Sequence, residues 1–284
     1  MNTYKLELER RLNKPDYTKL PQALGLGQTY SDITSDNDFK KMLHIADRYG
    51  QKYIMFFKLK EDVNINTILS NLINKSYSPN IPMGNMNLKV AYVKKTGNNF
   101  EIIANSYSEV MKWKDITDTR REKVSVITRR VAYIEYNHST KILTFAQDPI
   151  GEGAGITQDM SIYLNEIFSE YNLFFDDLFE TIELLKPVCT LIDDGVLSSS
   201  KLQGTDEATG RQHETVGKNK RDNLKDDNIF KALKDESYSL NRIRLGHKNF
   251  KGTFEVFSGN ILRIWFNING DNTSELKTSI TSIL

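Results

Sequence analysis

The sequence has a single cysteine, Cys189, in 284 residues, so an intramolecular disulfide is excluded. A chain without disulfides is typical of a reducing compartment, and we expect a cytoplasmic protein. Apolar runs are short: the one from Tyr53 to Phe57 falls far below the roughly 20 residues that a membrane-spanning helix needs. The N-terminal residues alternate charged and apolar side chains, which is not the pattern of a secretory signal. We therefore expect no membrane association.

Complete catalytic motifs are also missing. With one cysteine and four scattered histidines there is no spacing for a zinc site. The tripeptide Glu275-Leu276-Lys277 matches the E-x-K of metal-dependent nucleases, but it lies in a predicted helix, with Asp271 too close to act as the first acid. The pair Asp193-Asp194 lacks an accompanying glutamate motif. Cys189 lies in an apolar run and is interpreted as a small buried residue.

Three glycines, Gly151, Gly153 and Gly155, lie between a predicted strand and a predicted helix. Such a turn can hold phosphate through backbone N–H groups. The spacing is not that of a dinucleotide or P-loop motif, however, and Glu152 and Asp159 would repel an anion. We interpret this segment as a flexible connection and predict no cofactor; Mg²⁺ would be needed only by a nuclease.

Charge is segregated along a chain whose formal net charge is only +1. Residues 142–185 contain no lysine or arginine, whereas residues 237–254 contain no acid. Segregated charge creates local fields that select partners. Basic residues beside aromatic ones on a sheet suit phosphate contact and base stacking. The candidate nucleic-acid contacts are Arg120, Arg121, Lys123, Arg129, Arg130, Arg242, Arg244, His247, Lys248 and Lys251.

Three acidic residues, Asp176, Glu180 and Glu183, have the spacing i, i+4, i+7 of one helix face. The ordinary interpretation is the solvated face of an amphipathic helix. Two alternatives are a cation site and a surface that docks a basic partner. A further alternative is that this helix forms salt bridges with the basic segments of its own chain.

Alternating apolar residues around tight turns predict three β-hairpins. Their turns are Thr96–Asn99, Asn137–Thr140 and Ser258–Asn260. A helix is expected after each hairpin: a short one from Ser106 or Ser108, a long one over residues 156–185, and a short one over residues 274–284. The stretch 156–185 is expected to be either one long helix or two helices with a break near Asn172. Further predictions are helices around Phe39–Ala46 and Ile65–Ile73 and strands at Tyr53–Leu59 and Val188–Ile192.

The pattern predicts an α+β fold with a mostly antiparallel sheet, built from repeated hairpin–helix units, with helices covering one face. Residues 196–228 have few apolar side chains and are predicted to be a polar mobile loop or linker. The expected division is a main α+β domain over residues 1–195, that linker, and a small hairpin–helix unit over residues 229–284 that packs on the main domain.

The functional hypothesis is a non-enzymatic binding protein that uses its charged faces to hold nucleic acid or a protein partner in a complex, with oligomerisation an open possibility. One alternative is a metal-dependent nuclease or other phosphodiester enzyme. A second is an obligate subunit that docks a basic partner through its acidic helix.

Overall fold

The computed structural model describes residues 3–12, 17–48, 52–79, 88–117, 120–148, 156–218, 222–264 and 271–282. The chain forms two compact units, each assembled from separated segments. Unit 1 comprises Met1–Arg48, Asn64–Glu135 and Ser161–Phe175, and unit 2 comprises Tyr49–Val63, Tyr136–Met160 and Asp176–Leu284. The fold is α+β with a large antiparallel sheet, which confirms the predicted fold class at that level.

Unit 1 has the strand order β2-β3-β4. Its elements are α1 (Thr3–Arg11), α3 (Leu20–Ala23), the 3-10 helix η1 (Tyr30–Asp32), α4 (Asp36–Arg48), α5 (Ile65–Asn71), β2 (Lys89–Thr96), β3 (Asn99–Thr117), most of β4 (Arg120–Asn137) and most of α6 (Ile156–Ser169). The predicted helix at residues 39–46 is confirmed as part of α4. Its residues Phe39, Met42, Leu43 and Ala46 are buried, which is the spacing of one helix face.

Helices lie on both faces of the unit 1 sheet. On one face, the Ser106 hydroxyl of β3 is bonded to the Tyr163 hydroxyl of α6 at 2.6 Å, and Phe100 packs against Phe168. On the other face, Glu101 accepts a hydrogen bond from Arg48 of α4 at 2.6 Å. Successive residues of a strand point to opposite faces. The expectation of helices on one face is therefore not confirmed.

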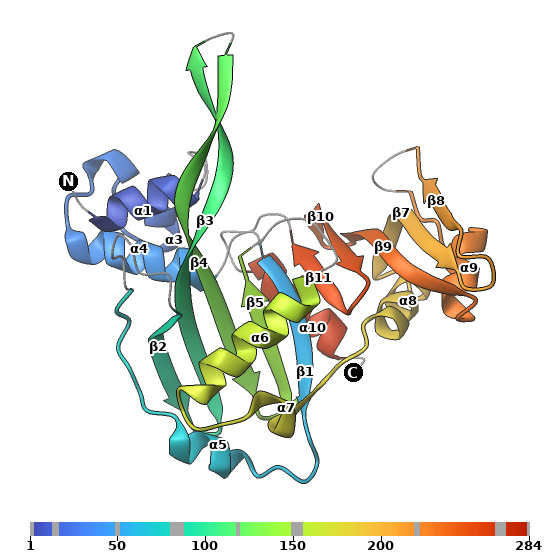
Figure 1. The fold of residues 1–284 in the computed structure, drawn as a ribbon, viewed down its shortest axis with the longest axis horizontal. Helices are drawn as coiled ribbons and strands as arrows, with labels where there is room; N and C mark the ends of the chain where they lie inside the picture. Colours follow the sequence, from blue (N-terminus) through green and yellow to red (C-terminus); the bar gives the residue numbers. More distant parts are fainter. Residues whose placement is uncertain are drawn as a thin grey trace. The chain divides into compact units, whose positions relative to one another are not determined.

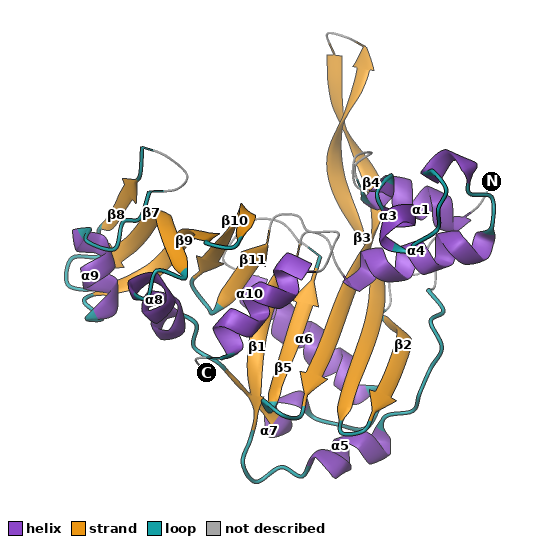
Figure 2. Cartoon of the chain, turned by 180° about the vertical axis from the view of Figure 1, so that it is seen from behind, coloured by secondary structure: helices purple, strands orange, loops and turns teal. Residues whose placement is uncertain are grey.

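Strands β3 and β4 continue beyond the rest of unit 1 as a two-stranded ribbon (Figure 1). They contain 19 and 18 residues, whereas their neighbour β2 has 8 and pairs with β3 only as far as Asn105. The helix expected from Ser106 or Ser108 is wrong, because β3 runs on to Thr117. The repeated hairpin–helix unit is consequently not confirmed. Helices α1, α3 and α4 gather near the base of this ribbon (Figure 2).

Unit 2 has the strand order β5-β1-β11-β10-β9-β7-β8, with the short β6 also paired to β1. Its elements are β1 (Lys52–Leu59), β5 (Ile142–Gln147), α7 (Phe175–Leu178), β6 (Phe179–Thr181), α8 (Leu185–Asp193), β7 (Leu197–Asp206), β8 (Gln212–Val216), α9 (Asn228–Lys234), β9 (Tyr238–His247), β10 (Phe250–Phe257), β11 (Ile261–Ile264) and α10 (Asp271–Thr281). The hairpin predicted at Ser258–Asn260 is confirmed: both Gly259 and Asn260 have positive φ, as a tight hairpin turn requires.

A single helix over residues 156–185 is wrong, whereas the expected break near Asn172 is confirmed; the second helix is shorter than expected and ends at Leu178. The chain breaks near Asn172, whose φ of 55° is left-handed, and resumes as α7 and then as β6. The strand expected at Val188–Ile192 is instead part of helix α8. Pro187 is compatible with this helix because it stands in the first turn, where the backbone N–H has no partner within the helix.

The polar segment expected to be a mobile loop contains two strands. Leu197, Ser199, Ser200 and Leu202 of β7 are buried. Strand β7 lies between β8 and β9, so its backbone groups are hydrogen-bonded on both sides. Gly204 of β7 lies close to the side chains of Tyr238 and Leu233, so a larger residue would have little room there.

Candidate functional site

Arg129 lies at the base of the ribbon and is buried, with 3% of its surface exposed. Its two terminal nitrogens donate to the two carboxylate oxygens of Asp47 on α4, each at 2.8 Å. Asp47 also accepts from the Tyr77 hydroxyl at 2.6 Å. Burial alone would lower the pKa of the Arg129 guanidinium, but the Asp47 carboxylate raises that pKa above its ordinary value. The assignment of Arg129 to a nucleic-acid surface is therefore corrected: it belongs to the interior of unit 1.

Arg242 and Arg244 lie on one face of β9 in unit 2, with side chains 26% and 29% exposed. Both donate to one oxygen of Glu255, a fully buried carboxylate on β10. The Nε atoms of Arg242 and Arg244 lie 2.8 and 2.9 Å from that oxygen, and an Arg242 terminal nitrogen makes a further short bond to it. The carboxylate that both arginines share comes from the neighbouring strand β10 and not from the expected acidic helix.

His247 does not join these arginines, because it points to the opposite face of β9. It is 7% exposed, its Nε2 lies 3.4 Å from the Ser279 hydroxyl of α10, and burial lowers its pKa. Its inclusion in a surface contact set is therefore corrected. Lys248, the next residue, is exposed at the turn between β9 and β10. The side chain of Lys251 lies outside the described residues.

The remaining candidates gather on β4 in the ribbon. Arg120 and Arg121 begin this strand, Lys123 follows with an exposed side chain, and Arg130 is half-buried near the base. The side chains of Arg120 and Arg121 are outside the described residues, and both residues are placed on the strand by its backbone. Strand β3 carries Lys112 and Lys114 toward the same tip.

The three acidic candidates do not share a helix face. Asp176 lies in α7, Glu180 in β6, and Glu183 in the connection to α8. Glu180 stands opposite Lys58 in the β6–β1 pair, and the backbone oxygen of Asp176 accepts from Lys60 at 2.6 Å. The spacing i, i+4, i+7 assumed a helix that the chain does not form at Glu180, and the acids instead lie beside lysines of their own unit.

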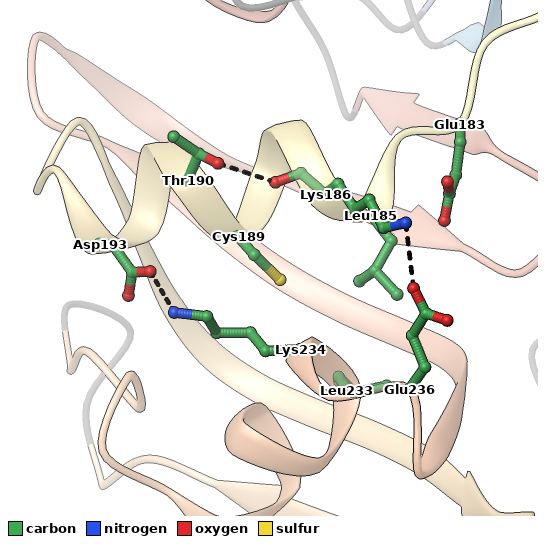
Figure 3. A pocket seen from close by; sticks show the side chains of 9 residues that line it. All are labelled: Glu183, Leu185, Lys186, Cys189, Thr190, Asp193, Leu233, Lys234 and Glu236. Carbon is green, nitrogen blue, oxygen red and sulfur yellow. Dashed lines mark hydrogen bonds and ion pairs between the residues drawn. The ribbon is translucent and has the colours of Figure 1, made fainter.

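A cavity of about 340 Å³ lies between α8 and α9 in unit 2 (Figure 3). Two ion pairs border it, Lys234–Asp193 at 2.5 Å and Lys186–Glu236 at 3.0 Å. The sulfur of Cys189 faces it, and burial raises the pKa of that thiol to about 11. The thiol is therefore protonated at neutral pH and is a poor nucleophile, which fits the small buried residue expected from sequence.

The other chemical candidates are not assembled into a site. Gly151, Gly153 and Gly155 lie outside the described residues. Glu275 of α10 accepts from the Asn249 side chain. Within the described ranges no group of three or more His, Cys, Asp or Glu side chains could hold a metal ion, and no helix there is long and apolar enough to cross a membrane.

Two residues that organise these sites, Asp47 and Glu255, are missing from the sequence-based candidates. The sequence carries a weak indication for Glu255. It stands between the apolar residues Phe254 and Val256, so in a strand its side chain must lie on the face opposite to theirs. The pairing of β10 with β9, which brings Glu255 opposite Arg244, cannot be read from sequence. Asp47 gives no signal beyond its place in an amphipathic helix.

No protein-family model matches this chain, and no curated protein matches it.

Proposed function

We propose that this protein is a non-enzymatic binding protein that holds nucleic acid within a complex, and that the β3–β4 ribbon makes the principal contact. The observation that carries the proposal is the concentration of basic residues near the tip of a ribbon that extends beyond the body of unit 1 (Figure 1).

The shape of the ribbon suits a groove of duplex DNA. From Ser108 to Thr117, β3 extends ten residues, or about 30 Å at roughly 3.3 Å per residue. The major groove of B-form DNA is about 12 Å wide and admits a two-stranded β-ribbon. Several DNA-binding proteins insert such ribbons. An isolated two-stranded ribbon is marginally stable in water, so a ligand that enclosed it would also order it.

The charge of the ribbon supports the same ligand. Between Met111 and Lys123 the basic residues are Lys112, Lys114, Arg120, Arg121 and Lys123, against the acids Asp115, Asp118 and Glu122. The Lys123 side chain, near the start of β4, is exposed to solvent. Exposed lysine and arginine supply the phosphate contacts that dominate nucleic-acid affinity.

The test is fluorescence anisotropy with short duplex DNA, single-stranded DNA and RNA over a salt series. Changing Arg120, Arg121 and Lys123 together to Gln is expected to weaken duplex binding at least about tenfold and to reduce the salt slope by about one per lost phosphate contact. A matched control changes three exposed lysines elsewhere, Lys94, Lys225 and Lys231, to Gln. It removes the same charge and is expected to bind as the wild type does.

If the two variants lose affinity for duplex DNA equally, the loss is explained by net charge alone, which would contradict a specific role for the ribbon. Binding that is absent at low salt would overturn the proposal in favour of a protein partner, to be sought by co-purification. Each sample is also incubated with Mg²⁺ and analysed on a gel, since cleavage would establish the nuclease alternative.

A further inference from the structure

A row of charged side chains crosses the sheet of unit 2 on one face. Arg244 of β9 stands opposite Glu255 of β10, Glu255 stands opposite Arg263 of β11, and Arg263 stands opposite Tyr53 of β1. Residues directly opposite each other in neighbouring strands share a face. Arg242, two residues before Arg244, joins the same face. We call Arg242, Arg244, Glu255 and Arg263 the arginine row.

The opposite face of these strands is the apolar core. Ile243, Leu245, Phe254, Val256 and Leu262 alternate with the row and are at most 1% exposed. The three arginines of the row are partly exposed. The face of the sheet that carries them is therefore in contact with solvent, whereas the core face is buried. The alternation places the positive charge on one side of the sheet only.

Arg242 has hydrogen-bonding capacity beyond its contacts with Glu255. Glu255 is fully buried, and both Arg242 and Arg244 donate to its carboxylate. Arg242 uses only two of its five N–H groups in its bonds to Glu255.

The guanidinium planes are held by two further contacts. Arg242 lies over the ring of Phe257 and Arg263 over the ring of Tyr53, each at 5.5 Å from the ring centroid. Stacking on a ring and bonding to a carboxylate restrict an arginine side chain. Such a guanidinium loses less entropy when it binds phosphate than a flexible surface lysine does.

We propose that the arginine row is a second phosphate-contact surface, separate from the ribbon, that binds the backbone of a nucleic-acid strand, with Glu255 as the positioning residue that orients Arg242 and Arg244. Phosphate oxygens accept the outward N–H groups in the bidentate geometry that guanidinium provides. This inference rests on the proposed nucleic-acid function but concerns different residues in a different unit.

Glu255→Gln is the decisive variant. It removes a negative charge beside the surface, so simple electrostatics predicts tighter binding of an anion. The proposal predicts the reverse, because a neutral amide holds two guanidinium groups less firmly than a carboxylate does. We expect anisotropy with single-stranded and duplex DNA to show binding at least about threefold weaker for this variant. Unchanged or tighter binding would overturn the positioning role.

The double variant Arg242→Gln with Glu255→Gln keeps the net charge of the wild type and leaves no isolated buried carboxylate. We expect this variant to keep its fold, checked by circular dichroism and thermal unfolding, to bind about tenfold more weakly, and to lose about one unit of salt slope. Arg244→Lys, which keeps the charge and loses the planar fork, is expected to weaken binding as well.

The matched control is Lys225→Gln with Lys231→Gln, a loss of two exposed positive charges in the same unit, which should leave the affinity unchanged. The two proposals fail in different ways. Loss of binding in the ribbon variant alone, with all row variants like the wild type, would reject the arginine row and leave the proposed function intact. A wild-type protein that binds no nucleic acid would overturn both.

Discussion

In unit 1 one carboxylate, that of Asp47, joins three parts of the chain. It receives two hydrogen bonds from Arg129 of β4 and one from Tyr77, and all three side chains are buried. A buried charge without its partner retains its full desolvation cost. The base of the ribbon therefore depends on a contact between residues 82 positions apart.

Asp47→Ala is expected to lower the free energy of unfolding by about 3–5 kcal/mol, because it leaves the Arg129 guanidinium buried and unpaired. Denaturant unfolding followed by circular dichroism measures this change. The matched control is Asp38→Ala on the same helix, which removes a partly exposed ion pair with Lys41 and should cost less than about 1 kcal/mol. Similar losses in the two variants would contradict the special role of Asp47.

His44 makes the stability of unit 1 depend on pH. Burial, followed by the nearby Arg48 charge, lowers the pKa of His44 from 6.5 to about 4, while Asp47 acts in the opposite direction. Between these values the unfolded chain binds a proton that the folded chain does not, so the free energy of unfolding falls as pH drops from 6.5 to 4.

The His44→Phe variant removes this titration and keeps a ring that can stack on Tyr77, as His44 does at 4.3 Å. We expect its unfolding free energy to change less between pH 7 and pH 4.5 than that of the wild type, measured by denaturant titration at both values. An unchanged pH dependence in the variant would show that other groups dominate.

At the scale of elements, local patterns succeeded where helix and strand have distinct signals. The amphipathic period of α4 and the hairpin turns at Gly97 and Gly259 were predicted correctly. The region from Phe179 to Ile192 was not, because short apolar runs fit a helix or a strand equally well. At Phe179 the pairing with Leu59 of β1 selects the strand conformation over the helix.

Helix α9 has only seven residues and depends on its cap. The Asp227 side chain accepts from the Ile229 backbone N–H at 2.8 Å. Asp227→Ala should therefore lower the free energy of unfolding by about 1 kcal/mol, while Asp227→Ser keeps an acceptor and should be nearly neutral. Thermal unfolding of the two variants side by side measures the difference; equal melting temperatures would show that the cap contributes nothing.

At the scale of the whole molecule, each unit is discontinuous in sequence. Strand β1, from the first quarter of the chain, lies between β5 and the late strand β11. Unit 2 therefore cannot be completed until residues 229–284 are present, and its core strands are joined by contacts of long sequence separation.

A fragment of residues 1–217 should consequently lack a folded unit 2. In this fragment β1 has no β11 to pair with, and the apolar side chains that β9 and β10 contribute to the core are missing. We expect rapid proteolysis within residues 176–217 of this fragment, compared with the full chain. Adding a second fragment of residues 218–284 should restore protection. A fragment that is protected by itself would show that the late strands are dispensable.

The sequence by itself determined the α+β class, the tight hairpins and the strongest amphipathic helix, because these depend on interactions between residues a few positions apart. It also located the basic clusters along the chain. Only the tertiary structure decided which charges meet: Arg129 with Asp47, and Arg242 and Arg244 with Glu255. Those pairs depend on strand register and helix packing, and buried charges are neutralised by whatever partner the fold brings within hydrogen-bond distance.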